Sequence, residues 1–212
     1  MVEAIIFDMD GVLFDTEKYY YDRRANFLAQ KGISIDHLPP SFFIGGNTKQ
    51  VWENILRDDY DNWDVPTLQE EYNAYKQDNP LPYKELIFPD VFKVLNEVNS
   101  RGLKIGLASS SVKADILRAL EENHLNGFFD VVLSGEEIKE SKPIPEIYLT
   151  ALQHLNVEAN QALIIEDSEK GIAAGVAAGV EVWAIKDNRF GMDQGAAKGL
   201  LDNLMDVLRS EE

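Results

Sequence analysis

The hydrophobic and polar positions of the chain predict strands and helices in alternation. The run 4–7 is wholly apolar, which is typical of a strand buried on both faces. Similar short runs predict four further strands, at 103–108, 128–133, 162–165 and 180–185. Segments with helical periodicity and helix-ending glycines lie between and after them. They predict helices at 89–101, 111–123, 145–155, 169–178 and 195–208.

Strands that alternate with helices favour an α/β fold with a parallel sheet covered on both faces. The segment 16–85 interrupts this alternation. It begins as a helix that stops at Gly32, and from Pro39 onward it is polar, aromatic and helix-like. Such a length is too great for a simple crossover. The pattern therefore predicts a core domain made of residues 1–15 and 86–212, with an inserted helical domain at 16–85.

The overall composition narrows the possible partners. The chain of 212 residues carries a net charge of −17, which argues against binding to nucleic acid or anionic membranes. It contains no cysteine, so neither disulfides nor thiolate metal sites are expected. Its sequence contains neither a long apolar span nor a signal-peptide pattern. We therefore expect a soluble cytoplasmic protein, monomeric or alternatively dimeric.

Polar side chains with complementary chemistry follow the predicted strands. The ends of parallel strands open onto one crevice, so these side chains should meet there. The first strand is followed by Asp8 and Asp10, the second by Ser109, Ser110 and Ser111, the third by a loop with Lys142, and the fourth by Glu166, Asp167 and Ser168. Each group alone has an ordinary explanation, such as a solvated turn, a helix cap or a surface lysine. Their convergence at one edge favours a functional site.

This set suits phosphoryl transfer. Carboxylates such as Asp8 and Asp167, with Glu166 nearby, are the oxygen ligands that Mg²⁺ prefers. A carboxylate beside the cation can attack phosphorus, and a second acid such as Asp10 can move the proton. The Ser109 hydroxyl, the start of the following helix and the Lys142 charge would bind the phosphate.

The same residues resemble the four motifs of the haloacid dehalogenase superfamily. Residues 8–16, Asp-Met-Asp-Gly-Val-Leu-Phe-Asp-Thr, resemble motif one in the form found in its phosphatases and mutases. Residues 107–109 resemble motif two, 142–148 motif three and 165–174 motif four. The resemblance covers essentially the whole chain and implies a Rossmann-like core with the first strand at its centre.

The resemblance also implies roles for individual residues. Asp8 would be the nucleophile and Asp10 the general acid/base. Ser109, Ser110 and Lys142 would bind the transferred phosphoryl group. The Mg²⁺ ligands would be Asp8, Asp10 through its backbone carbonyl, Glu166 and Asp167. The insert 16–85 would be a helical cap that closes over the site and selects the substrate.

Within the family the chain is most similar to the β-phosphoglucomutase-like and phosphoglycolate-phosphatase-like branch. Thr16, Tyr20 and Lys49 are its candidate substrate residues in the cap. True β-phosphoglucomutases carry histidine at the position of Tyr20 and arginine near that of Lys49. These departures favour a phosphatase of a small phosphorylated metabolite, such as a sugar phosphate, with a phosphomutase as the alternative.

A non-enzymatic phospho-acceptor of the receiver type is a further alternative, because it also combines acids, a hydroxyl and a lysine on a parallel sheet. Its phospho-accepting aspartate should follow a later strand. Here the Asp-x-Asp pair follows the first strand, and a helical insert comes after it. The order of the motifs therefore favours the enzyme.

Overall fold

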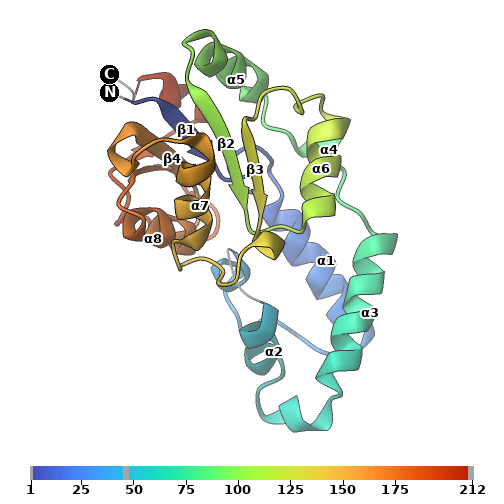
Figure 1. Cartoon of the computed structure of the whole chain (residues 1–212). Helices are drawn as coiled ribbons and strands as arrows, with labels where there is room; N and C mark the ends of the chain where they lie inside the picture. The colour runs from blue at the N-terminus through green and yellow to red at the C-terminus, as the bar shows by residue number, and fades with distance from the viewer. Residues whose placement is uncertain (1, 45–47, 210–212) are drawn as a thin grey trace.

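The computed structural model describes residues 2–44 and 48–209, except for the side chains of residues 48–50. It confirms the predicted α/β class with a Rossmann-like sheet (Figure 1). All strand pairs are parallel, in the order β3-β2-β1-β4-β5-β6. The strands are β1 Ala4–Phe7, β2 Lys104–Ser109, β3 Val131–Ser134, β4 Ala162–Glu166, β5 Glu181–Ile185 and β6 Gly199–Leu201.

Strand β1 lies in the middle of the sheet, between β2 and β4. Successive strand side chains point to opposite faces, so Ile5 and Phe7 join one apolar cluster while Ala4 and Ile6 join the other. Helices α5 (Val91–Ser100) and α6 (Lys113–Glu122) pack on the first face. Helices α7 (Glu146–Leu155) and α8 (Glu169–Ala177) cover the second (Figure 1). Burial on both faces explains the unbroken apolar run of β1.

The predicted helix at 195–208 is wrong. Gly199–Leu201 forms the edge strand β6, and Leu204–Arg209 forms a 3₁₀ helix, η5. A Cβ at Gly199 would lie 2.5 Å from the Trp183 ring, so close packing against β5 explains the glycine. Leu201, Leu204 and Val207 are all buried, and their spacing by three imitates a helical face. The sheet thus has one strand more than expected.

Between residues 17 and 78, the described part of the segment after Thr16 forms helices joined by loops and contains no strand. It contains α1 (Glu17–Gln30), η1 (Pro40–Phe43), α2 (Thr48–Leu56), η2 (Arg57–Asn62) and α3 (Val65–Asp78). These elements share an apolar cluster of their own, separate from the two clusters of the sheet. Figure 1 shows them beyond the ends at which the strands' arrowheads point. They therefore lie next to the crevice formed by the strand ends.

The chain then returns to the sheet. Helix α4 (Tyr83–Leu86) packs against α6, and Leu81 and Tyr83 belong to the apolar cluster of α5 and α6. The division into domains at 15/16 and 85/86 stays a prediction. Across residues 2–44 and 48–209, no helix combines the length and apolar character needed to cross a membrane.

Candidate active site

The predicted strand-end residues converge at the topological switch point of the sheet, where the chain connections run to opposite sides of β1. Strand β1 is paired with β2 on one side and β4 on the other, and this reversal opens a crevice beyond the strand ends. Asp8 follows β1 directly, and its backbone N–H donates to Ile165 O of β4 at 2.9 Å. Ser109 is the last residue of β2, and Glu166 is the last of β4.

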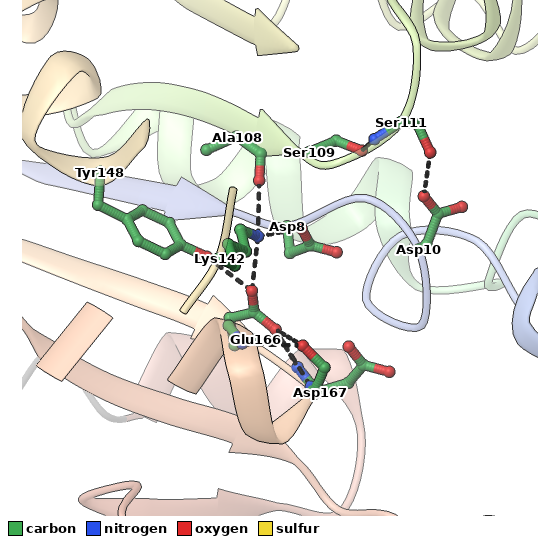
Figure 2. A network of polar contacts seen from close by, with 11 residues as sticks. Asp8, Asp10, Ala108, Ser109, Ser111, Lys142, Tyr148, Glu166 and Asp167 are labelled. Atoms are coloured by element: carbon green, nitrogen blue, oxygen red, sulfur yellow. Dashed lines mark hydrogen bonds and ion pairs between the residues drawn. The ribbon is translucent and has the colours of Figure 1, made fainter. Parts of the chain in front are cut away.

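Lys142 lies between two of the acids (Figure 2). Its ammonium donates to Asp8 Oδ1 at 2.6 Å, to Glu166 Oε1 at 2.7 Å and to Ala108 O at 3.1 Å. The lysine is 4% exposed, so these three acceptors replace its water. Burial alone would lower the pKa of Lys142, but Asp8 and Glu166 raise it well above its usual value. The site therefore holds a fixed positive charge beside Asp8.

Glu166 is held on both of its oxygens. Oε1 also accepts from Tyr148 OH at 2.7 Å, while Oε2 accepts from the backbone N–H of Asp167 and Ser168 at 3.0 and 3.1 Å. Burial would raise the pKa of Glu166, yet Lys142 and these hydrogen bonds bring it below its usual value. A Cβ on Gly171 would lie 1.7 Å from Oε1, so the glycine is needed for this packing.

Asp8, Glu166 and Asp167 each present a carboxylate oxygen within 4.8 Å of the others. Burial, together with nearby acids, raises the pKa of Asp8 to about 8 and that of Asp167 well above its usual value. A cation would favour the ionised form of each. The donor set thus fits a hard divalent cation, with Asp8 and Asp167 less committed to protein donors than Glu166.

Asp10 accepts two short hydrogen bonds from hydroxyls. Thr16 Oγ1 donates to its Oδ1 at 2.6 Å. Ser111 Oγ donates to its Oδ2 at 2.6 Å (Figure 2). Tyr20 OH lies 3.3 Å from Ser111 Oγ. Burial raises the pKa of Asp10, although these hydroxyls oppose the shift. Thr16 and Tyr20, which were predicted from the sequence as substrate residues, therefore lie near Asp10. Ser111, which contacts Asp10 directly, was assigned no role from the sequence.

The predicted phosphate-binding serines differ in their surroundings. Ser109 is fully buried, and its Oγ accepts from the Ser111 backbone N–H at 3.0 Å. Ser110 is exposed and lines the cavity beside Asp8 and Lys142. Lys49 lies in the first turn of α2, but its side chain lies outside the described residues. The glycines before it, Gly45 and Gly46, also lie outside them.

A cavity of about 210 Å³ joins the strand ends to the helical segment. From the helical segment it is lined by Glu17, Tyr20, Arg23, Arg24, Phe43, Tyr72 and Lys76. Sequence reasoning missed all of these except Tyr20. Residues 17, 20 and 24 are three or four positions apart, so they lie on the same face of α1. The prediction of Tyr20 as a substrate residue could therefore have identified Glu17 and Arg24 as residues of the cavity.

Known proteins with similar sequences and folds identify the family of this chain. Residues 5–185 match the family described as haloacid dehalogenase-like hydrolase. The chain is 30% identical over 205 residues to a phosphorylated carbohydrates phosphatase of Thermotoga maritima, covering 92% of each chain. It is 28% identical to a phosphoglycolate phosphatase of Aquifex aeolicus, covering 85% of this chain and 83% of the relative.

Among solved structures, the β-phosphoglucomutase of Clostridium difficile superposes with a TM-score of 0.82 at 26% identity. That match covers 100% of this chain and 97% of the other. Together with the family match, it confirms the resemblance drawn from the four motifs. The chain therefore belongs to the haloacid dehalogenase-like hydrolases, in their branch of β-phosphoglucomutase-like and phosphoglycolate-phosphatase-like enzymes.

Proposed function

We propose that this enzyme is a Mg²⁺-dependent phosphatase that hydrolyses a small phosphorylated carbohydrate through an aspartyl-phosphate intermediate. The observation that carries the proposal is the position of Asp8, hydrogen-bonded to buried Lys142, with Asp10 two residues further along at the same cavity. The names of the relatives support the substrate class, since one is a phosphorylated carbohydrates phosphatase and another a phosphoglycolate phosphatase.

In the first step, an Asp8 oxygen attacks phosphorus, and the bond from phosphorus to the substrate oxygen breaks. The Lys142 ammonium keeps Asp8 in place and offsets the charge on the transferring phosphoryl group. Ser110 lines the cavity next to these residues and is a candidate hydrogen-bond donor to that group. Bound Mg²⁺, held by Asp8, Asp167, Glu166 and the Asp10 carbonyl, would neutralise negative charge among the acids.

Asp10 supplies the proton in the same step. Burial raises its pKa above that of an ordinary aspartic acid, which favours the protonated form that donates to the leaving alkoxide. In the second step, the Asp10 carboxylate accepts a proton from water, which attacks the phosphorus of the intermediate and releases phosphate and Asp8. Hydrogen bonds from Thr16 and Ser111 fix the orientation of Asp10 for both tasks.

Phosphomutase activity is the second candidate, supported by the similarity to a β-phosphoglucomutase structure. A mutase must deliver a sugar hydroxyl, in place of water, to the intermediate. Burial and the nearby Asp10 raise the pKa of Tyr20 well above its usual value. The phenol thus stays neutral, so Tyr20 does not supply the positive charge that a histidine at this position could offer to a second phosphate. This favours transfer to water.

Phosphate release from 4-nitrophenyl phosphate and a panel of sugar phosphates tests the proposal, with Mg²⁺ and with EDTA. We expect turnover that requires Mg²⁺ and that is lost in Asp8→Asn. Turnover that survives in Asp8→Asn would contradict the mechanism. Conversion of β-glucose 1-phosphate to glucose 6-phosphate, primed by a trace of sugar bisphosphate, would favour the mutase instead.

A further inference from the structure

Three cations of the helical segment line the same cavity as the acids: Arg23 and Arg24 of α1 and Lys76 of α3. In a chain with 37 acidic and 20 basic residues, a group of cations without acidic partners is unexpected. Among the described residues, none of the three forms an ion pair. Asp115 also lines the cavity, but its own ion pair is with Arg118.

Within residues 2–44 and 48–209, the two arginines have buried N–H groups without acceptors. Arg23 is 8% exposed; its Nη1 donates to Asn79 O at 3.1 Å, while its Nε has no partner. Arg24 Nη1 is also buried without a partner. A guanidinium has five donors in a planar fork that matches carboxylate and phosphate oxygens. Unsatisfied donors of this kind indicate an acceptor that the described residues do not supply.

Aromatic rings hold the cations in place. The Arg23 guanidinium lies 5.3 Å from the ring centroid of Tyr20, and that of Arg24 lies 5.0 Å from Phe43 and 5.5 Å from Tyr72. The Lys76 ammonium lies 5.3 Å from the same Tyr72 ring. Such stacking limits side-chain motion. The three charges are thus positioned before any ligand arrives.

The cations also act on one another. Burial lowers the pKa of Lys76, and the charges of Arg23 and Arg24 add to this effect, while Tyr72 and Asp115 oppose it. A bound anion would relieve the repulsion among the three groups. A bound oxyanion would therefore stabilise these three cations more than a neutral hydroxyl would.

We propose that Arg23, Arg24 and Lys76 bind a second anionic group of the substrate, while its scissile phosphate lies at Asp8. The inference rests on the proposed phosphatase function and narrows its substrate class. The preferred substrate is a small phosphorylated metabolite that carries a carboxylate or a second phosphate away from the reacting phosphate. The volume of about 210 Å³ lies below the roughly 300–1,000 Å³ of typical ligand pockets, so it suits a small metabolite rather than a larger ligand.

Matched substrates test this inference. Gluconate 6-phosphate differs from glucitol 6-phosphate only in a carboxylate in place of a terminal CH₂OH. Fructose 1,6-bisphosphate and fructose 6-phosphate form a second pair, which tests phosphate as the second anion. For at least one pair we expect kcat/KM to be about 10- to 100-fold higher for the substrate with the second anion.

Arg24→Gln and Lys76→Gln should each bring that ratio toward one. Lys18→Gln is the matched control, because Lys18 is an exposed cation on the same helix that pairs with Asp22; it should leave the ratio unchanged. Equal kcat/KM within both pairs in the wild-type enzyme would overturn the inference. So would an equal loss on both members of a pair in Arg24→Gln, because the arginine would then act on the transferred phosphate.

Binding separates this inference from the proposed function. Calorimetry with Asp8→Asn and Mg²⁺ measures the affinity for each member of a pair without turnover. Tighter binding of the substrate with the second anion, lost when Arg24→Gln is added, supports the inference even if the wild-type protein fails to hydrolyse 4-nitrophenyl phosphate. Equal binding of both members would overturn it even if the phosphatase proposal holds.

Discussion

The charged groups on the two sides of the cavity differ in whether the described residues supply their hydrogen-bond partners. At the strand ends, Lys142 and Glu166 have partners within the chain for nearly every donor and acceptor. Across the cavity, Arg23 and Arg24 have buried N–H groups for which the part of the chain that the structure describes offers no acceptor. Lys142 and Glu166 are paired before substrate binds, whereas the helical side has donors still available. Under the proposed function, the core performs the chemistry and the helical segment selects the substrate.

The strand-end side of the cavity also requires glycine at two backbone positions. Gly11 has a φ of +78° and lies where a Cβ would be 1.9 Å from Asp167 Oδ2, and Gly171 is just as close to Glu166. Glycine avoids both clashes because it has no side chain. Glu166 and Asp167 are thus fitted closely against backbone. Even small changes here should affect the chemistry.

Asp10→Asn should have the largest effect among the changes that test this division. The amide cannot donate or accept the transferred proton, so we expect kcat/KM on sugar phosphates to fall by about 10² to 10⁴-fold. The loss in kcat/KM should be smaller for 4-nitrophenyl phosphate, because kcat/KM reports formation of the intermediate and this leaving group needs little protonation. Steady-state kinetics on both substrates measure the difference. Equal losses on both would show that Asp10 has another role.

Gly171→Ala tests the close packing around Glu166. The new methyl would meet Glu166 Oε1, so the carboxylate or helix α8 must move, at a cost of about 1–3 kcal/mol in unfolding free energy. We expect a lower Tm and weaker Mg²⁺ binding. Gly127→Ala is the control, since a Cβ there meets nothing within 4 Å. If both variants behave alike, Glu166 is not held as tightly as described.

Mg²⁺ should stabilise the protein more at pH 8 than at pH 6. Asp8 keeps its proton up to a pKa of about 8 in the folded protein, against 3.8 for the ordinary side chain. Its contribution to stability is therefore present below about pH 4 and is lost as the pH rises through 8. Metal binding must displace this proton, which becomes easier at higher pH. Thermal melts with and without Mg²⁺ measure the increment, and an increment that shrinks with rising pH would contradict this account.

Tyr20→Phe should have the smallest effect. Its hydroxyl lies 3.3 Å from Ser111 Oγ, which in turn holds Asp10. Removing one such hydrogen bond corresponds to about 0.5–1.5 kcal/mol, or roughly 2- to 10-fold in kcat. The ring remains to stack on Arg23. A loss above 100-fold would place the phenol in the reaction itself.

Much of the catalytic side could be predicted from the sequence, because its residues are fixed by their positions next to buried strands. An apolar run ending in Asp8 predicts both the strand and the place of the carboxylate. Lys142 was predicted from the order of the motifs, and the structure brings it to Asp8 and Glu166. The edge strand β6 was missed because leucines spaced by three fit a helix equally well.

The helical side was harder to predict, since no strand end fixes where its residues point. Arg23, Arg24 and Lys76 meet only because α1 and α3 pack together around Phe27 and Tyr72. Their spacing of four residues places Arg24 and Tyr20 on the same face of one helix, but no sequence pattern places Lys76 near either of them. Ser111 was similarly assigned no role, since its contact with Asp10 joins positions 101 residues apart.

The central claim, that Asp8 accepts the phosphoryl group, can be tested directly by mass spectrometry. Asp10→Asn should still form the intermediate from 4-nitrophenyl phosphate but hydrolyse it slowly. After an acid quench with Mg²⁺ present, we predict that the peptide containing Asp8 carries the added mass of one phosphoryl group. The double variant Asp8→Asn/Asp10→Asn should show no such mass. An unmodified Asp8 in enzyme that still releases 4-nitrophenol in a burst, or a phosphoryl group on another residue, would contradict the account.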